Sequence, residues 1–179
     1  VSLSAAGKFS YPTGRDGAKA LGYDPAIIES AHSRFFEASC GVGNPFSLGA
    51  IRPGDSVLDF GCGAGFDLFV ASKLVGESGL VRGIDLTENM VVRAGENLAL
   101  AGSTNYEVKI VDRETIPYDD RSFDVVISNG VINLSPSKET TFAEIYRVLK
   151  RGGRLQFADV VLENELPADL AGSTEAWSQ

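Results

Sequence analysis

The chain has 179 residues, of which 44% are apolar and 22% are charged, and its 16 basic and 24 acidic side chains give a net charge of −8. This length and composition fit one globular domain with a single buried core and exclude a disordered chain. The negative charge disfavours nucleic acid as a partner, no apolar run reaches the roughly 18 residues of a membrane span, and we expect no signal peptide.

Residues 1–50 are rich in glycine, proline and small polar residues. One helix is predicted there, over residues 25–38. Pro25 suits the first turn of such a helix, and the side chain of Asp24 can cap its first N–H groups.

From residue 55 onward, short apolar runs alternate with segments of helical periodicity. The runs predict strands at residues 56–60, 80–85, 106–110, 123–128 and 154–161, and the other segments predict helices at residues 67–75, 88–100 and 138–149. Runs such as Val125-Val126-Ile127 are apolar throughout, which is typical of strands buried on both faces. The sequence therefore predicts an α/β fold built on a doubly wound, mostly parallel sheet.

The last predicted helix has an apolar stripe. Its members recur at helical spacing and are Phe142, Ile145, Tyr146 and Leu149. Such spacing places side chains on one face of a helix, so we expect this stripe to face the core.

A glycine-rich loop follows the first predicted strand. The stretch reads Val57-Leu58-Asp59-Phe60-Gly61-Cys62-Gly63-Ala64-Gly65-Phe66-Asp67. Glycines at a strand-to-helix turn let the backbone turn sharply and approach a ligand closely. Nucleotides, flavins and S-adenosylmethionine all bind at turns of this kind, so the loop alone leaves the ligand open.

Three details distinguish these ligands. The glycines are spaced G-x-G-x-G, and Phe66 stands where the dinucleotide fingerprint needs a third glycine. Asp59 precedes the loop, and its carboxylate would repel a pyrophosphate but suits the amino group of a methionine moiety. No Gly-Lys-Ser/Thr follows, which excludes a phosphate-binding P-loop. The loop therefore favours S-adenosylmethionine, with contacts from Asp59, Gly61, Cys62, Gly63 and Gly65.

An acidic residue, Asp85, ends the second predicted strand. At that position a carboxylate can accept both hydrogen bonds from a ribose diol. The alternative is an ordinary capping aspartate before Leu86-Thr87. Together with the glycine-rich loop, Asp85 favours the ribose role.

The stretch after the third predicted strand offers carboxylates for an adenine ring. Asp112 is the first candidate to accept a hydrogen bond from the adenine amino group, and Glu114 is its competitor; either can instead be a solvated loop charge. Leu86, Met90 and Arg113 complete the predicted cofactor contacts.

Taken together, these residues resemble the class I S-adenosylmethionine-dependent methyltransferases over residues 55–166. The glycine-rich loop and Asp85 are followed in family order by Phe123-Asp124-Val125-Val126 and by Arg147-Val148-Leu149-Lys150-x-Gly152-Gly153. The resemblance implies a seven-stranded fold and a methyltransferase acting on a small molecule. It also implies that the loop after the fourth strand lines the methyl-transfer chamber.

That loop narrows the resemblance. It reads Ser128-Asn129-Gly130-Val131-Ile132-Asn133-Leu134, and with residues 40–46 and 158–161 it resembles the arsenite methyltransferase group. Members of that group bind trivalent arsenic, a soft metalloid, through cysteine thiolates. Cys40 matches one of these cysteines, Gly130 stands where another is expected, and a third is expected beyond Gln179.

The resemblance implies in-line transfer of a sulfonium methyl group, for which the protein mainly orients the partners and excludes water. Asn129, Asn133 and Cys40 are the candidates for orienting the acceptor, and Asn129 is also a candidate cofactor contact. Alternatively, Asn133 satisfies a buried turn, and Cys40 and Cys62 pack as small hydrophobic side chains. No general base is predicted. A thiol or arsenic acceptor needs no strong base, and the absence of a histidine near the predicted site is also consistent with a carbon or amine acceptor.

Two other functions remain open at this point. One is an NAD- or flavin-linked oxidoreductase, and the other is a protein that binds the cofactor without catalysis. The sequence has too few cysteines for a disulfide framework and too few cysteines and histidines for a zinc site or a histidine-based triad; they are Cys40, Cys62 and His32. We therefore expect a cytoplasmic protein without a metal site. Its expected partner is a small-molecule methyl acceptor.

Three parts of the chain are expected. Residues 1–50 form a helical and loop extension that is either a lid over the cofactor or a simply packed segment. Residues 51–166 form the methyltransferase core, and residues 167–179 begin a C-terminal part too short to supply the last two strands of the family. The fifth strand would then leave an exposed apolar edge, which natural proteins avoid. We therefore expect either a fragment of a longer chain or an edge covered by a partner, such as a second copy.

Overall fold

The computed structural model describes residues 13–112 and 115–161. Five parallel strands form one sheet in the order β3-β2-β1-β4-β5. They are β1 (Ser56–Phe60), β2 (Leu80–Asp85), β3 (Tyr106–Ile110), β4 (Phe123–Asn129) and β5 (Leu149–Ala158). The order reverses at β1, which lies between β2 and β4, and sheets of this kind bind ligands at the carboxyl ends of the strands beside such a reversal.

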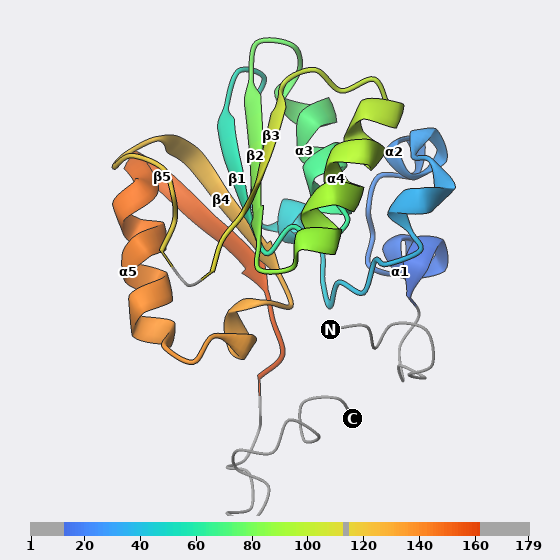
Figure 1. Ribbon diagram of the computed structural model, residues 1–179. Coiled ribbons are helices and arrows are strands. Elements are labelled where there is room, and N and C mark those ends of the chain that lie inside the picture. The colour runs from blue at the N-terminus through green and yellow to red at the C-terminus, as the bar shows by residue number, and fades with distance from the viewer. Residues whose placement is uncertain (1–12, 113–114, 162–179) are drawn as a thin grey trace, which may run out of the picture.

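Helices cover both faces of the sheet (Figure 1). One face carries α1 (Gly14–Ala20), α2 (Pro25–Ser30), α3 (Phe66–Val75) and α4 (Glu88–Leu100), and the other carries α5 (Lys138–Val148). Three short 3₁₀ turns complete the described elements: η1 (Ser33–Phe35), η2 (Pro45–Leu48) and η3 (Ile132–Leu134). The predicted doubly wound parallel sheet is confirmed. None of the helices in residues 13–112 and 115–161 is long and apolar enough to cross a membrane.

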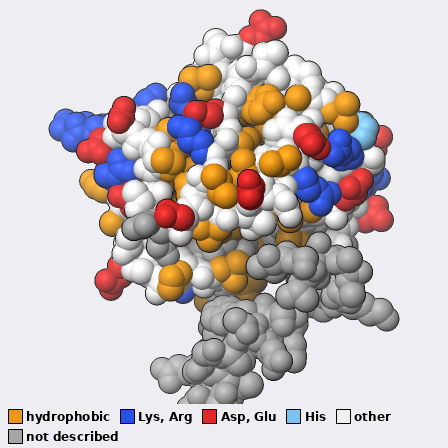
Figure 2. All heavy atoms as spheres, in the orientation of Figure 1, with side chains coloured by type: hydrophobic (Ala, Val, Ile, Leu, Met, Phe, Trp, Pro, Cys, Tyr) orange, Lys and Arg blue, Asp and Glu red, His pale blue; other side chains and the backbone are white. Residues whose placement is uncertain are grey.

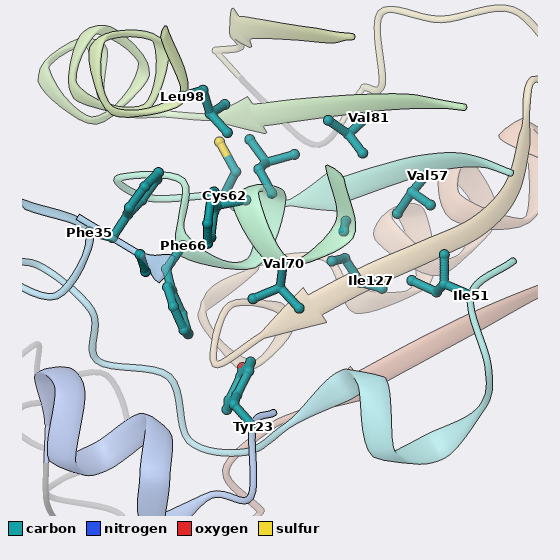
Figure 3. Close-up of a cluster of buried hydrophobic side chains, with 14 of the residues drawn as sticks. Tyr23, Phe35, Ile51, Val57, Cys62, Phe66, Val70, Val81, Leu98 and Ile127 are labelled. Carbon is teal, nitrogen blue, oxygen red and sulfur yellow. The ribbon is translucent and has the colours of Figure 1, made fainter. Parts of the chain in front are cut away.

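The core is split by the sheet into two apolar clusters. Alternate strand residues point to opposite faces, so Val57 packs with α3 and α4 while its neighbour Leu58 packs with α5. Figure 3 shows the first cluster, which includes Phe35 from the N-terminal segment, residues 13–50. The ring of Phe35 packs against that of Phe69 in α3, with centroids 4.8 Å apart. The N-terminal segment therefore contributes side chains to the hydrophobic core.

The predicted stripe on the last helix is only partly confirmed: Ile145 is buried and Leu149 packs against the core, but the two aromatic members do not face it. Tyr146 is 82% exposed and Phe142 is 40% exposed. The buried face of α5 consists of Thr141, Ile145 and Val148, which also recur at helical spacing. The two aromatic rings suggested a core face, but the residues that the sheet covers are smaller and one of them is polar.

The predicted helix over residues 25–38 is shorter than expected. Asp24 does cap it, accepting a hydrogen bond from the N–H of Ala26 at 2.7 Å. The helix ends at Ser30 because Ala31 is extended, and the guanidinium of Arg15 donates to the last carbonyls, Ile28 O at 2.6 Å and Ala31 O at 2.9 Å. This long-range contact is invisible to a local helix pattern, and α1, which carries Arg15, was not predicted either.

The fifth strand was placed too far along the chain. It was predicted at residues 154–161, whereas β5 spans Leu149–Ala158 and pairs with β4 through a register shift near Phe123. Leu149 is already extended where α5 ends, so helix and strand follow each other directly. Val160 and Val161 lie outside the strand and are exposed.

Charged side chains of both signs are mixed on the surface. On the face shown in Figure 2, Lys and Arg side chains alternate with Asp and Glu. Ion pairs such as Arg34–Glu96 (2.7 Å) and Arg93–Glu37 (3.0 Å) join the N-terminal segment to α4. Such exposed pairs contribute little energy each, so apolar contacts mainly hold the segment.

We predict that Gly83→Ala destabilises the fold, because a Cβ on this residue of β2 would lie 2.5 Å from Leu68 Cδ1 and 2.8 Å from Cys62 Sγ, both buried. Overpacking of this kind costs about 1–3 kcal/mol of unfolding free energy. Gly95→Ala is the matched control: nothing lies within 4 Å of its added Cβ, and alanine favours a helix by up to about 1 kcal/mol. Urea unfolding of both variants measures the difference, and equal stabilities would contradict this packing.

Candidate functional site

The glycine-rich loop connects the end of β1 to the start of α3. Its backbone is in the left-handed region at Gly61 (φ 79°), Gly63 (φ 51°) and Gly65 (φ 89°), which glycine adopts without strain. The N–H of Gly61 donates to the carbonyl of Ile84 at 2.9 Å. An added Cβ at Gly61 would lie 2.5 Å from the methyl groups of Val131. The loop is thus held between the end of β2 and the segment after β4.

Asp85 joins the end of β2 to this loop. Its Oδ2 accepts from the N–H of Gly63 at 2.9 Å, and its Oδ1 accepts from the N–H of Thr87 at 2.9 Å. The bond from Thr87 lies in the turn before α4, so Asp85 also makes the local side-chain-to-backbone bond that is expected of an ordinary capping aspartate. Each carboxylate oxygen keeps a further lone pair, which leaves Asp85 able to accept a ligand hydroxyl.

A cavity lies at the carboxyl end of the sheet, between the glycine-rich loop and the N-terminal segment. Its lining includes Tyr23, Cys40, Asp59, Gly61, Asp67 and Asn129, and we refer to it as the acidic cavity. The described residues that line it include two aspartates and no Lys, Arg or His. Such a cavity favours a cationic group.

The two aspartates differ in their partners. Asp67 accepts hydrogen bonds from Tyr23 Oη at 2.7 Å and from Asn129 Nδ2 at 3.1 Å. Asp59 is 2% exposed, and its Oδ2 has no hydrogen-bond partner among the described residues. A buried carboxylate oxygen without a donor is costly, so Asp59 Oδ2 is the atom at which a ligand donor would gain most.

Burial and neighbouring charge act together on these groups. Burial first, and then the negative charges of Asp67 and Asp85, raise the pKa of Asp59 well above its usual range. Burial also raises the pKa of Asp67, against the hydrogen bonds from Tyr23 and Asn129. The pKa of Tyr23 is raised by burial and by Asp67, so Tyr23 is a neutral donor.

The two cysteines occupy different environments. Cys62 belongs to the glycine-rich loop, and its side chain, drawn with its sulfur in Figure 3, is buried among apolar side chains. Burial raises the pKa of its thiol. Cys62 therefore packs as a small hydrophobic side chain, which was one of its two predicted roles, and it also borders the acidic cavity. Cys40 is exposed and lines the same cavity from the N-terminal side.

The predicted adenine side of the site lies at the ends of β2 and β3. Asp112 lines an open hollow there whose other walls are mainly apolar, namely Leu86, Ile110, Val111, Thr115 and Pro117. Arg113 and Glu114 lie outside the described residues. Met90 lies in the first turn of α4 and borders neither hollow nor cavity.

The loop after β4 carries the remaining predicted residues. The N–H of Asn133 donates to Asp159 Oδ2 at 2.9 Å, while its own Oδ1 is buried without a partner among the described residues. Asn133 does not line the acidic cavity. Gly130 has φ 73°, and a Cβ added to it would lie 3.5 Å from both Val42 methyl groups, so a Cβ meets no clash there, although the left-handed backbone strains a non-glycine residue.

Tyr23 and Asp67 are site residues that the sequence did not indicate as such. Asp67 lies in the first turn of α3, where an acidic residue is explained equally well by the helix dipole. Tyr23 meets Asp67 across 44 residues of sequence, and no local pattern marks it.

A methyltransferase-domain profile matches residues 51–179, and the chain therefore belongs to the methyltransferase domain family. It is 41% identical over 158 residues to an arsenite methyltransferase of Halobacterium salinarum, covering 88% of this chain and 40% of that protein. It is 38% identical over 162 residues to an arsenite methyltransferase of Mus musculus, covering 86% and 42%.

Among solved structures, it resembles an arsenic(III) S-adenosylmethionine methyltransferase from Chlamydomonas reinhardtii, with a TM-score of 0.68 and 36% identity over 89% of this chain and 53% of that one. These relatives confirm the resemblance to S-adenosylmethionine-dependent methyltransferases of the arsenite methyltransferase group. The chain spans about two fifths of the length of the two curated relatives.

We predict that Asp59→Asn stabilises the free protein. Because the pKa of Asp59 is raised in the folded state, the folded chain binds more protons than the unfolded chain, and stability falls as pH rises above the unfolded value of about 4. The variant loses this dependence and gains about 1 kcal/mol at neutral pH. Urea unfolding at pH 5 and pH 8 measures it, with the exposed Asp119→Asn as control. A variant less stable than wild type at pH 8 would contradict the prediction.

Proposed function

We propose that this chain is the cofactor-binding part of an S-adenosylmethionine-dependent methyltransferase that acts on a small molecule. The main support is that Asp59 Oδ2 is buried without a hydrogen-bond partner among the described residues. The described residues that line its cavity include no basic side chain. An ammonium group supplies both the charge and the donor that Asp59 Oδ2 lacks. A pyrophosphate would place two more negative charges beside Asp59 and Asp85, which disfavours a dinucleotide.

The other contacts follow along the same edge of the sheet. Asp85, already fixed by Gly63 and Thr87, accepts a ribose hydroxyl. The apolar hollow at Leu86 and Val111 receives the adenine ring, with Asp112 at its rim to accept from the amino group. These contacts orient the cofactor along the carboxyl ends of β1, β2 and β3.

The bound cofactor supplies an activated methyl group on a sulfonium centre, so the residues of this chain need only hold the partners in line and exclude water. No described residue of the acidic cavity is a histidine or lysine. A soft nucleophile, such as trivalent arsenic or a thiolate, needs no base, and the relatives named above act on arsenite by name. We therefore infer a soft acceptor that approaches from the side of Cys40.

The N-terminal segment is part of the site in this proposal. Thr13, Gly14, Tyr23 and Cys40 line the acidic cavity from that side. The segment thus covers the methionine end of the cofactor. We also propose that the protein is cytoplasmic.

Isothermal titration with S-adenosylhomocysteine and with NADH tests the cofactor. We expect binding of S-adenosylhomocysteine and none of NADH. Loss of the charged acceptor in Asp59→Asn weakens binding roughly ten- to hundredfold, whereas the exposed Asp119→Asn leaves it unchanged. Binding of NADH alone would identify an oxidoreductase instead. Normal cofactor binding without methylated arsenite, thiol or quinol product would indicate a binding protein without catalysis.

The acceptor is tested by restoring a thiol at Gly130. A Cβ at this position meets only the Val42 methyl groups, at 3.5 Å, although a positive φ costs a non-glycine residue about 1 kcal/mol. We expect Gly130→Cys to bind arsenite roughly tenfold more tightly than wild type, because a second soft ligand joins Cys40. Gly130→Ser is the matched control, with the same size and strain. Equal arsenite affinities of the two variants, measured by titration calorimetry, would contradict a soft-acceptor site here.

A further inference from the structure

The segment of residues 40–44 lies directly over the ends of β4 and β5. A Cβ added to Gly41 would lie 2.4 Å from Asn129 Nδ2, and one added to Gly43 would lie 2.4 Å from the Cβ of Ala158. The backbone of this segment therefore approaches the sheet more closely than any residue with a side chain allows. Such an approach leaves backbone N–H and C=O groups that need partners.

Asn129 supplies those partners from the end of β4. Its Oδ1 accepts from the N–H groups of Val42 at 2.9 Å and Gly43 at 3.2 Å, and its Nδ2 donates to the carbonyl of Gly43 at 2.9 Å. One side-chain amide thus pairs with the segment much as a neighbouring strand would. The two N–H donors also fix which end of the amide carries the oxygen.

The amide nitrogen of Asn129 also donates to groups that line the acidic cavity. Nδ2 also lies 3.1 Å from Asp67 Oδ2 and 3.1 Å from Tyr23 Oη. An amide has two N–H donors and one oxygen acceptor with two lone pairs, and both ends of Asn129 are fully occupied by protein groups. The Asn129 side chain therefore has no free donor or acceptor for a substrate.

The segment that Asn129 holds also carries Cys40. Cys40 and Gly41 line the acidic cavity together with Asp59 and Gly61. Although Cys40 is partly exposed, desolvation in this position raises the pKa of its thiol. The place of the thiol relative to the cofactor loop therefore depends on the backbone of residues 40–44, and that backbone depends on Asn129.

We propose that Asn129 is a positioning residue, which fixes the 40–44 segment and the Cys40 thiol beside the cofactor cavity and does not itself contact the acceptor. This deepens the proposed function and rests on it, because the acceptor is taken to approach from the side of Cys40. Asp67 belongs to the same arrangement, since it bonds both Asn129 and Tyr23 at the methionine end of the cavity. Occupation of the cavity and the position of Cys40 are thereby linked.

The test is the rate at which iodoacetamide alkylates Cys40, followed by mass spectrometry against pH. Buried Cys62 in the same chain is the internal reference. In Asn129→Ala we expect the ligand-free rate at Cys40 to rise about fivefold and its pH midpoint to fall toward that of an ordinary thiol. Asn129→Asp keeps the acceptor for the Val42 and Gly43 N–H groups and should give an intermediate rate.

Asn105→Ala is the matched control, because Asn105 Nδ2 also bonds two backbone carbonyls, those of Gly76 and Gly79, away from this cavity. It should leave both the rate and the pH midpoint at Cys40 unchanged. A rise of the same size in Asn105→Ala would show general loosening and overturn the proposal, as would unchanged Cys40 kinetics in both Asn129 variants. If Asn129→Ala does not fold, the Asn129→Asp comparison decides alone.

Saturating S-adenosylhomocysteine separates this inference from the proposed function. In wild type we expect the ligand to protect Cys40, and in Asn129→Ala we expect this protection to be lost even at ligand concentrations that saturate the variant. Protection of Cys40 retained in saturated Asn129→Ala would overturn the positioning role. Absence of S-adenosylhomocysteine binding to wild type would overturn the proposed function, and the ligand-free rates would still decide the role of Asn129.

Discussion

Three carboxylates meet at the carboxyl end of the sheet, and the protein satisfies only two of them. Asp85 accepts two backbone N–H groups, and Asp67 accepts a tyrosine hydroxyl and an amide. Asp59, the most deeply buried of the three, keeps one oxygen without a donor. A buried, partly unsatisfied carboxylate lowers stability, and for this reason we propose that a bound ligand supplies a positively charged donor to Asp59.

The rest of the fold holds that group in place. The glycine-rich loop donates hydrogen bonds to the carbonyl of Ile84 at the carboxyl end of β2 and lies against Val131. The N-terminal segment lies against β4 and β5 at Gly41 and Gly43. Each contact needs a glycine because the backbone approaches side chains at distances that exclude a Cβ. Segments far apart in sequence therefore close one cavity, and Asn129 is the residue at which they meet.

Much of this arrangement was predictable from local sequence. The segments of β1 to β4 contain short apolar runs bounded by turn residues, and their alternation with helical segments leads to a doubly wound sheet. The glycine spacing and Asp85 are also local signals, so the loop and its acid were found. The face of α5 was only partly predicted: Ile145 is buried as expected, but Thr141 and Val148 take the places that the large side chains of Phe142 and Tyr146 suggested.

What could not be predicted depends on long-range contacts. The bond from Asn129 to the N–H of Val42 spans 87 residues, and Tyr23 reaches Asp67 across 44. Nothing in the sequence near Asn129 shows that its amide is used by backbone groups, so it was expected to contact an acceptor or cofactor. Likewise Arg15, which ends α2 by binding its carbonyls, acts across 13 and 16 residues.

A crystal structure of the chain with bound S-adenosylhomocysteine would show whether Asp59 binds the amino group of the cofactor. We expect the amino nitrogen of the ligand within about 3.2 Å of Asp59 Oδ2 and the ribose hydroxyls at Asp85. We also expect the adenine ring in the hollow beside Asp112. A ligand whose amino group faces away from Asp59, with Oδ2 still lacking a donor, would contradict this role of Asp59.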